Sequence, residues 1–208
     1  MTTVVPVRGV FEVNCYFFVD EQTGHGFVID PGAEAGRLLD LIRRKDWIIE
    51  KILLTHGHFD HTGAVNEIRD ALGIPVFAHE NSAHYLLDAR MNLSEECGSP
   101  ILIHDAFPLK DGDTICLSEN PAFSLSVLFT PGHTTDSISL YSEKENTLFV
   151  GDTIFKGTIG TYQYPGGNYN DLRESIVKKL FMLPDKTLLL SGHSEKTSIG
   201  QEKRRYGL

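Results

Sequence analysis

The chain has 208 residues, of which 41% are hydrophobic and 23% are charged, a balance typical of globular proteins and not of disordered ones. The formal net charge is −9, and the only basic cluster, at residues 202–207, is expected to be a solvated tail, so no nucleic-acid partner is expected. No stretch approaches the ~20 apolar residues of a membrane helix, and the N-terminus does not resemble a signal peptide, so no membrane partner is expected either.

Short β-like runs alternate with amphipathic helical segments along the chain. The runs are rich in Val, Ile, Phe and Tyr and predict strands at residues 11–19, 25–30, 51–55, 74–79, 124–130, 137–141, 147–152 and 187–192. Helices are predicted at 34–44, 62–73, 81–91 and 170–183, the last with Asn170 as its N-cap. Strands followed by helices, twice over, predict an α/β fold with two sheets and helices on the outside.

The three cysteines are far apart in the sequence and form no C-x-x-C pair: Cys15, Cys97 and Cys116. This spacing argues against a disulfide framework and against a zinc–thiolate site. We therefore expect a cytoplasmic protein, and the length predicts a single domain over residues 1–208.

Several predicted strands stop at a histidine or aspartate beside a small residue. These endings are Asp30, His56, His133, Asp152 and His193. Strand ends are rigid, and a neighbouring glycine or proline lets the backbone turn away from the side chain. Side chains from such endings would converge on one rim of a sheet and form a basin rich in potential metal ligands.

The segment Thr55–His61, "THGHFDH", adds further ligands next to one of these endings. His56 and His58 are two residues apart and can point the same way toward one metal, whereas Asp60 and His61 can face a second. His133 and His193 would complete one set each, and Asp152 has two oxygens with which to bridge. Imidazole and carboxylate ligands without thiolate suit zinc, and also iron or manganese. The sequence therefore predicts a site for two divalent metal ions.

Other polar residues are expected to have lesser roles. Asp30 can orient a ligand histidine without binding a metal itself. His79 also follows an apolar run but lacks the glycine or proline, and we interpret it as a rim residue. His25, His84 and His104 belong to no cluster in the sequence.

The segments "THGHFDH", "TPGHTTDS", "FVGDTIF" and "SGHSEKTSIGQEK" resemble the metallo-β-lactamase superfamily in order and spacing, from about residue 3 to the C-terminus. Within it, "EVNCYFFVD", "VIDPG" and "IPVFAHE" are similar to short glyoxalase II-type hydrolases. The resemblance implies an αββα sandwich, two mixed sheets flanked by helices, with two metals at one edge of the sheets.

By this resemblance the first metal would be held by His56, His58 and His133, and the second by Asp60, His61 and His193, with Asp152 bridging. The implied activity is hydrolysis of a thioester such as S-D-lactoylglutathione, in which a metal-bound hydroxide attacks the carbonyl carbon. Asp60 would be catalytic as well as a ligand, because it could orient the hydroxide and accept its proton.

Three departures from the family pattern concern substrate recognition. The chain has no room after His193 for the helical domain with which full-length glyoxalase II grips glutathione. Thr161 stands where relatives have a basic residue, and Gln163 stands where many short forms have Asp. The segment "HTTDS" replaces the more usual "HTPGS". Tyr162 and Tyr164 either offer aromatic surface to a substrate or pack under a loop.

Four alternatives remain open at this point. A persulfide dioxygenase would use one iron held by two His and one Asp, but it favours the Arg that is missing at Thr161. A lactonase would differ mainly in its pocket. A true β-lactamase is disfavoured by the absent secretory signal and by the bridging Asp152. A metal-binding scaffold or sensor would need a closed site. The acyl group, the thiol carrier, the metal and the oligomeric state are not determined by the sequence.

Overall fold

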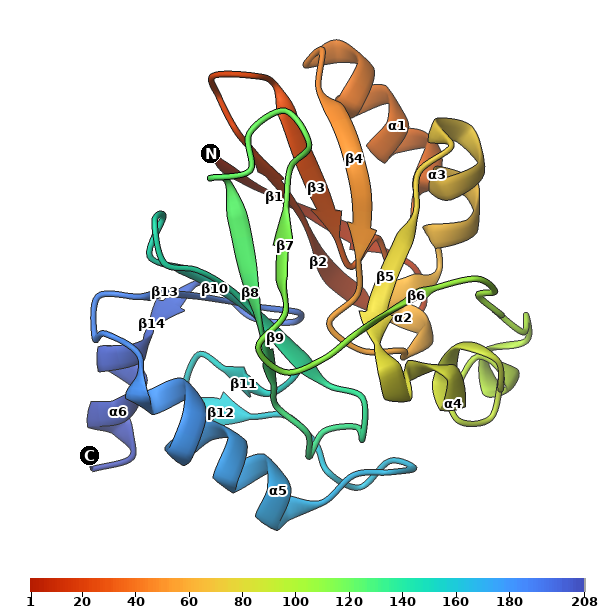
Figure 1. The fold of residues 1–208 in the computed structure, drawn as a ribbon. Coiled ribbons are helices and arrows are strands. Elements are labelled where there is room, and N and C mark those ends of the chain that lie inside the picture. Colours follow the sequence, from red (N-terminus) through yellow and green to blue (C-terminus); the bar gives the residue numbers. More distant parts are fainter. Residues whose placement is uncertain (208) are drawn as a thin grey trace.

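Two six-stranded β-sheets pack face to face in the computed structural model, which describes residues 1–207 (Figure 1). The first sheet has the strand order β1-β2-β3-β4-β5-β6, antiparallel from β1 to β3 and parallel from β3 to β6. Its strands are β1 (Thr2–Arg8), β2 (Glu12–Val19), β3 (His25–Ile29), β4 (Ile48–Leu53), β5 (Val76–His79) and β6 (Phe107–Leu109).

The second sheet has the order β14-β13-β10-β9-β8-β7, and only β10 and β13 run parallel in it. Its strands are β7 (Thr114–Cys116), β8 (Ser124–Phe129), β9 (Ile138–Ser142), β10 (Thr147–Gly151), β13 (Leu188–Ser191) and β14 (Thr197–Ser198). A separate two-stranded hairpin consists of β11 (Ile154–Phe155) and β12 (Thr158–Ile159).

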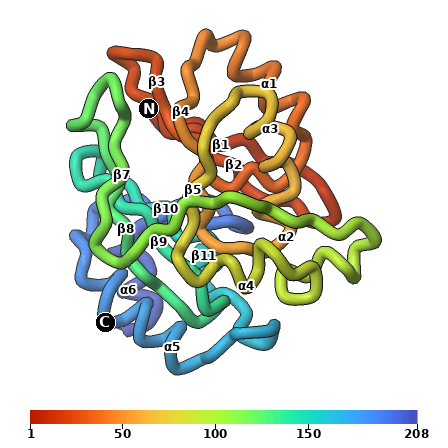
Figure 2. The backbone as a smooth tube through the Cα atoms, turned by 45° about the vertical axis from the view of Figure 1, so that its right-hand side comes forward, coloured from red at the N-terminus to blue at the C-terminus, as the bar shows by residue number. Residues whose placement is uncertain are grey.

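Helices cover the outer face of each sheet. The α-helices are α1 (Ala35–Arg44), α2 (Phe59–Thr62), α3 (Val65–Leu72), α4 (Ala83–Leu86), α5 (Tyr169–Glu174) and α6 (Ile199–Arg205). Short 3₁₀ turns form η1 (Glu80–Ser82), η2 (Glu95–Cys97) and η4 (Leu180–Met182), and η3 (Ser175–Lys179) is π-helical. Figure 2 shows α5 and α6 on the opposite side of the molecule from α1 and α3. The predicted αββα sandwich is therefore confirmed.

Alternation along β2 explains how one strand serves two layers of the core. Phe17 and Val19 face the layer between the first sheet and helices α1 and α3, whereas Tyr16 and Phe18 face the layer between the two sheets. This follows from the two-residue period of a strand, whose successive side chains point to opposite faces. A third apolar layer, which includes Leu172 of α5, lies between the second sheet and helices α5 and α6.

Three local predictions are corrected by the structure. Asn168, not Asn170, caps α5, because its side chain accepts hydrogen bonds from the backbone N–H groups of Asn170 and Asp171. The helix predicted at 81–91 shrinks to η1 and α4, since residues 88–92 form turns held by the Asp88 and Asn92 side chains. Residues 202–205 belong to α6 and are not a solvated tail, because Glu202 is buried.

Among residues 1–207, no helix is long and apolar enough to cross a membrane.

Candidate metal centre

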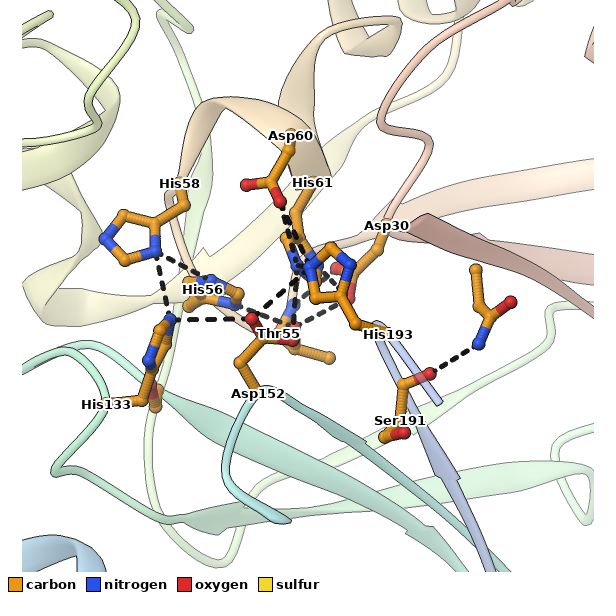
Figure 3. A network of polar contacts seen from close by, with 12 residues as sticks. Asp30, Thr55, His56, His58, Asp60, His61, His133, Asp152, Ser191 and His193 are labelled. Carbon is orange, nitrogen blue, oxygen red and sulfur yellow. Dashed lines mark hydrogen bonds and ion pairs between the residues drawn. The ribbon is translucent and has the colours of Figure 1, made fainter. Parts of the chain in front are cut away.

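The ends of strands from both sheets meet at one edge of the sandwich (Figure 3). β4 ends just before Thr55 and His56, and α2 carries Asp60 and His61. Asp152 follows β10, and the chain leaves β13 through Gly192 to His193. A Cβ atom at Gly192 would collide with the Asp152 carboxylate and with the His61 ring, so glycine is required there. The predicted convergence of strand ends is confirmed.

Three histidines form the first group of potential ligands. The Nδ1 atom of His58 lies 3.2 Å from Nε2 of His56 and 3.0 Å from Nε2 of His133. All three rings are buried. The Nδ1 group of His133 donates a hydrogen bond to the carbonyl oxygen of Thr161 at 2.7 Å, which leaves Nε2 with its lone pair facing the other two histidines.

A second group contains two histidines and a carboxylate. Nε2 of His193 lies 3.4 Å from Nε2 of His61 and 3.1 Å from Oδ2 of Asp60. The outer nitrogens are fixed from behind, because His61 Nδ1 faces Asp30 at 3.0 Å and His193 Nδ1 donates to the carbonyl oxygen of Glu12 at 2.6 Å. The inner nitrogens, Nε2 of both histidines, face the carboxylates of Asp60 and Asp152.

Asp152 lies between the two groups. One oxygen, Oδ1, is 3.4 Å from Nε2 of His61, and the other, Oδ2, is 3.4 Å from Nε2 of His193 and 3.7 Å from Nε2 of His133. The carboxylate thus faces both groups at once, the position predicted for a bridging ligand (Figure 3).

The chemistry of these side chains fits divalent cations. Ligand atoms of His56, His58 and His133 lie within 4.8 Å of one another, and those of Asp60, His61 and His193 do so as well. Converging lone pairs and carboxylates repel one another unless a cation lies between them. Within residues 1–207, the buried Oδ1 of Asp152 and Nε2 of His58 have no hydrogen-bond partner. Buried polar atoms are rarely left so, except at functional sites.

The two groups of potential ligands differ in the charge of their side chains. Burial, and then the neighbouring histidines, hold the pKa of His56 well below its ordinary value, and burial lowers the pKa of His58 to about 3. Burial also opposes charge on His61, but Asp152, Asp60 and Asp30 outweigh it and raise its pKa. The first group therefore consists of neutral imidazoles, whereas the second has an excess of negative charge. Both conditions favour bound cations.

Asp30 supports the centre from behind, as the sequence suggested. Its carboxylate accepts hydrogen bonds from the backbone N–H of Thr55 at 2.8 Å and from the Thr55 hydroxyl at 2.6 Å, besides facing His61. Because that hydroxyl donates to Asp30, its oxygen is free to accept from Nδ1 of His56 at 3.2 Å. One carboxylate thus orients a histidine of each group. Thr55, which the sequence analysis did not single out, relays this contact.

Asp136 is a second buried carboxylate that the sequence analysis left without a role. It accepts a hydrogen bond from the Ser82 hydroxyl at 2.7 Å and lies against Gly57, between the two histidines of "HGH". Burial raises its pKa to about 6. Only its place in the departure "HTTDS" could have drawn attention to it.

Two further histidines lie outside the ligand groups, and His79, interpreted from the sequence as a rim residue, does not line the cavity beside them. His79 stacks on Phe129, with ring centroids 4.2 Å apart, and its Nδ1 accepts a hydrogen bond from the backbone N–H of Asn81. His25 pairs with Glu50 at 2.8 Å.

A cavity of about 370 Å³ opens onto the ligands. Besides ligands, its lining residues are largely apolar or aromatic: Phe11, Glu12, Phe59, Leu93, Phe155, Thr161 and Tyr164. The Tyr164 ring lies edge-on to His58 at 5.9 Å, whereas Tyr162 packs against Tyr169 at 5.2 Å. The cavity lining includes no lysine or arginine, and Thr161 is one of its walls.

Comparison with known proteins agrees with this architecture. A sequence model described as the metallo-beta-lactamase superfamily matches residues 8–193. A protein of Bacillus subtilis named probable metallo-hydrolase YqgX is 39% identical, over 94% of this chain and 91% of its own. The hydroxyacylglutathione hydrolase GloC of Haemophilus influenzae is 32% identical, over 97% and 94%.

Solved structures give the same result. The BLEG-1 B3 metallo-beta-lactamase superposes with a TM-score of 0.92 at 36% identity, covering 98% of this chain and 97% of its own. TTHA1623, in a di-iron-bound form, superposes with a TM-score of 0.85 at 33% identity, covering 97% and 98%. With this fold, these His and Asp side chains at the strand ends and this extent of sequence match, the chain belongs to the metallo-beta-lactamase superfamily.

Proposed function

We propose that the protein is a dinuclear metal-dependent hydrolase that acts on thioesters. The observation that carries the proposal is the arrangement of seven ligand-type side chains in two groups, with the Asp152 carboxylate facing both, at the base of an apolar cavity. The relative named hydroxyacylglutathione hydrolase supports a thioester substrate.

The first metal would be held by His56, His58 and His133, the second by Asp60, His61 and His193, with Asp152 shared between them. Two divalent ions bound there would activate water and polarise the carbonyl of the substrate. Zinc suits these ligands, and iron is the alternative, since the similar TTHA1623 is described in a di-iron-bound form.

Asp60 is suited to hold a proton at the reacting centre. Burial would raise its pKa, but His61 and the hydrogen bond from His193 outweigh burial, so the pKa is lowered and the carboxylate is ionised near neutral pH. An ionised carboxylate on the ligand cluster can orient a water molecule and accept its proton.

The cavity walls would hold the acyl group and exclude bulk water. Phe59, Leu93 and Tyr164 supply apolar surface, and the Thr161 carbonyl is already occupied by His133. No cation beside the ligands would pair with a charged acyl group, so a neutral acyl group fits best.

The proposal is tested by measuring metal content and hydrolysis together. Protein purified without added metal should contain about two transition-metal ions per chain and should hydrolyse at least one member of a panel of glutathione thioesters, other thioesters and lactones. His58→Ala and Asp152→Ala should lower kcat/KM at least ~100-fold, whereas the exposed His104→Ala should not change it. Metal-replete protein that hydrolyses no thioester would refute the proposal. Metal-dependent oxygen uptake in the presence of a persulfide would instead indicate a persulfide dioxygenase.

A β-lactam is the second candidate substrate, because the similar BLEG-1 structure is described as a B3 metallo-beta-lactamase. The same panel should therefore include a chromogenic cephalosporin. Turnover of the cephalosporin with a higher kcat/KM than of any thioester would favour this alternative.

A further inference from the structure

A second hollow adjoins the metal cavity at His193. It has a volume of about 790 Å³ and shares His193 and Glu12 with the metal cavity, and Lys156 and Lys196 are among its other lining residues. Both lysines also line an adjoining hollow of about 470 Å³, together with Gln201, Arg204 and Arg205. The two hollows thus form one groove that leads from a metal ligand to a cluster of four cationic side chains. We call this the basic groove.

The backbone around the basic groove is held in place by buried contacts. The tip of the β11–β12 hairpin is fastened to α6, because Gly157 N–H donates to the Glu202 carboxylate at 3.0 Å (Figure 1). Glu202 is buried and also accepts from the Thr197 hydroxyl at 2.6 Å. Lys156 N–H donates to the Ser194 hydroxyl at 3.0 Å, one residue from His193. The fold therefore fixes where the four cations emerge.

Positive charge at this place is unusual for a chain with a net charge of −9. Among the acidic side chains nearby, Glu195 pairs with Lys156, Glu202 lies 3.9 Å from Arg205, and Glu12 lines the end next to the metals. Lys196 and Arg204 form no ion pair within residues 1–207. Cations therefore predominate at the far end of the groove, where they would attract an anion.

We propose, resting on the proposed function, that the basic groove binds the polyanionic part of the substrate's thiol carrier, of the phosphate-bearing class. The neutral acyl group occupies the metal cavity, and the carrier passes His193 into the groove. Two residues, Ser194 and Glu195, separate His193 from Lys196, which limits the distance between the Cα atoms of His193 and Lys196 to about 11 Å. An extended carrier spans that distance, and lysine and arginine together suit phosphate groups.

The division of charge supports this orientation of the substrate. The lining of the metal cavity includes no lysine or arginine, whereas Lys156, Lys196, Arg204 and Arg205 line the hollow of about 470 Å³. Binding energy from the remote anion would orient the reacting thioester over the metals.

The test compares carriers and matched variants. One acyl group is presented on coenzyme A, on glutathione and on uncharged N-acetylcysteamine. In the triple variant Lys156→Gln, Lys196→Gln and Arg204→Gln, kcat/KM for the coenzyme A thioester should fall about tenfold or more, mainly through KM, with less dependence on salt. The uncharged thioester should change less than about twofold. A control with the same loss of charge, Lys45→Gln, Lys144→Gln and Lys178→Gln, alters exposed lysines outside the groove.

Each outcome decides between the two proposals. An equal fall for all three carriers, or none for coenzyme A, would overturn the basic groove while leaving thioester hydrolysis intact. A fall confined to the glutathione thioester would refute the phosphate class. Where the wild type hydrolyses no thioester, the proposed function fails. Calorimetric binding of coenzyme A to the metal-free wild type and triple variant then still tests the groove, and equal affinity for both would refute it.

Discussion

Replacing Asp30 by asparagine would test how the metal centre is organised without removing a ligand. Asp30 accepts hydrogen bonds from the Thr55 N–H and hydroxyl groups and faces Nδ1 of His61. An asparagine can keep one oxygen on the Thr55 N–H, but its NH₂ group then faces the Thr55 hydroxyl and the His61 ring. His61 would have to move its proton to Nε2, the nitrogen that faces Asp60 and Asp152. A protonated Nε2 cannot bind a metal.

The expected magnitude follows from the bond that is lost. A hydrogen bond to a charged group contributes about 1.5–3 kcal/mol, and each ~1.4 kcal/mol is a tenfold change in affinity. Metal affinity should therefore fall about 10- to 100-fold, the range typical for loss of the outer partner of a ligand histidine. The loss should concentrate on one of the two binding steps, because only one ligand of the second group is reoriented.

A zinc titration of metal-free protein against a chromophoric chelator would measure both steps. Asp20→Asn is the matched control, since Asp20 is also buried and accepts side-chain hydrogen bonds from Thr23 and Asn120, but at a hairpin away from the ligands. Unchanged affinity in both steps for Asp30→Asn would refute the role of Asp30. An equal loss in Asp20→Asn would show general destabilisation instead.

Three further predictions concern stability. The pKa of Asp136 is raised to about 6, so ionisation of its carboxyl group destabilises the fold. The free energy of unfolding of the wild type, relative to that of Asp136→Asn, should fall by up to ~3 kcal/mol as the pH rises from about 4 to about 6 and should then stay level. Urea unfolding with a chelator present would measure this, and the same pH dependence in the wild type and the variant would contradict it. In differential scanning calorimetry, adding a chelator should lower the Tm of the wild type, because a ligand at 100 times its Kd stabilises the folded state by about 2.7 kcal/mol. The Tm of His58→Ala should fall less, because this variant lacks one of the side chains proposed to hold the metal. Glu202→Ala removes the acceptor of the Gly157 N–H and one of the two acceptors of the Thr197 hydroxyl, the other being Gln201, and should cost about 1–3 kcal/mol in denaturant unfolding. A loss below about 0.5 kcal/mol would mean that the Gly157 N–H finds another partner.

The sequence predicted eight of the twelve strands in the two sheets, because local patterns mark them, and missed β1, β6, β7 and β14. Each predicted strand matches a strand of the structure to within a few residues, since β-branched and aromatic runs between glycines and prolines are a direct signal. The side chains at the strand ends meet because β3 and β4 run parallel in the first sheet and β10 and β13 run parallel in the second, so the strands of each pair end at the same edge. His56, Asp152 and His193 were brought together by topology, which the alternation of strands and helices already implied.

Features that depend on distant contacts could not be predicted. Glu202 was expected to belong to a solvated tail, but its carboxylate is buried and accepts hydrogen bonds from the Thr197 hydroxyl and from the Gly157 N–H. Gly157 lies in the β11–β12 hairpin, more than forty positions earlier in the sequence. Asp136 belongs to the segment "HTTDS", and nothing in that segment indicated that its carboxylate packs against Gly57. In both cases the sequence shows that the residue is acidic, but it does not show which hydrogen-bond donors offset the cost of burying the carboxylate.

Metal binding and the docking of the two sheets are coupled in this architecture. The Tyr16 hydroxyl and the Asn14 amide of β2, in the first sheet, both donate to the Ser191 carbonyl at the end of β13, in the second, at 2.7 Å and 2.9 Å. The next residues along the chain are Gly192 and His193, and Nδ1 of His193 returns to the carbonyl of Glu12 in β2. Because side chains from both sheets must meet to hold one pair of ions, a cation bound there would also hold the sheets together, and docking of the sheets would strengthen metal binding by the same coupling free energy. Residues such as Tyr16 thus contribute to the ligand cluster without belonging to it, whereas the four cations of the basic groove are not part of these contacts between the sheets.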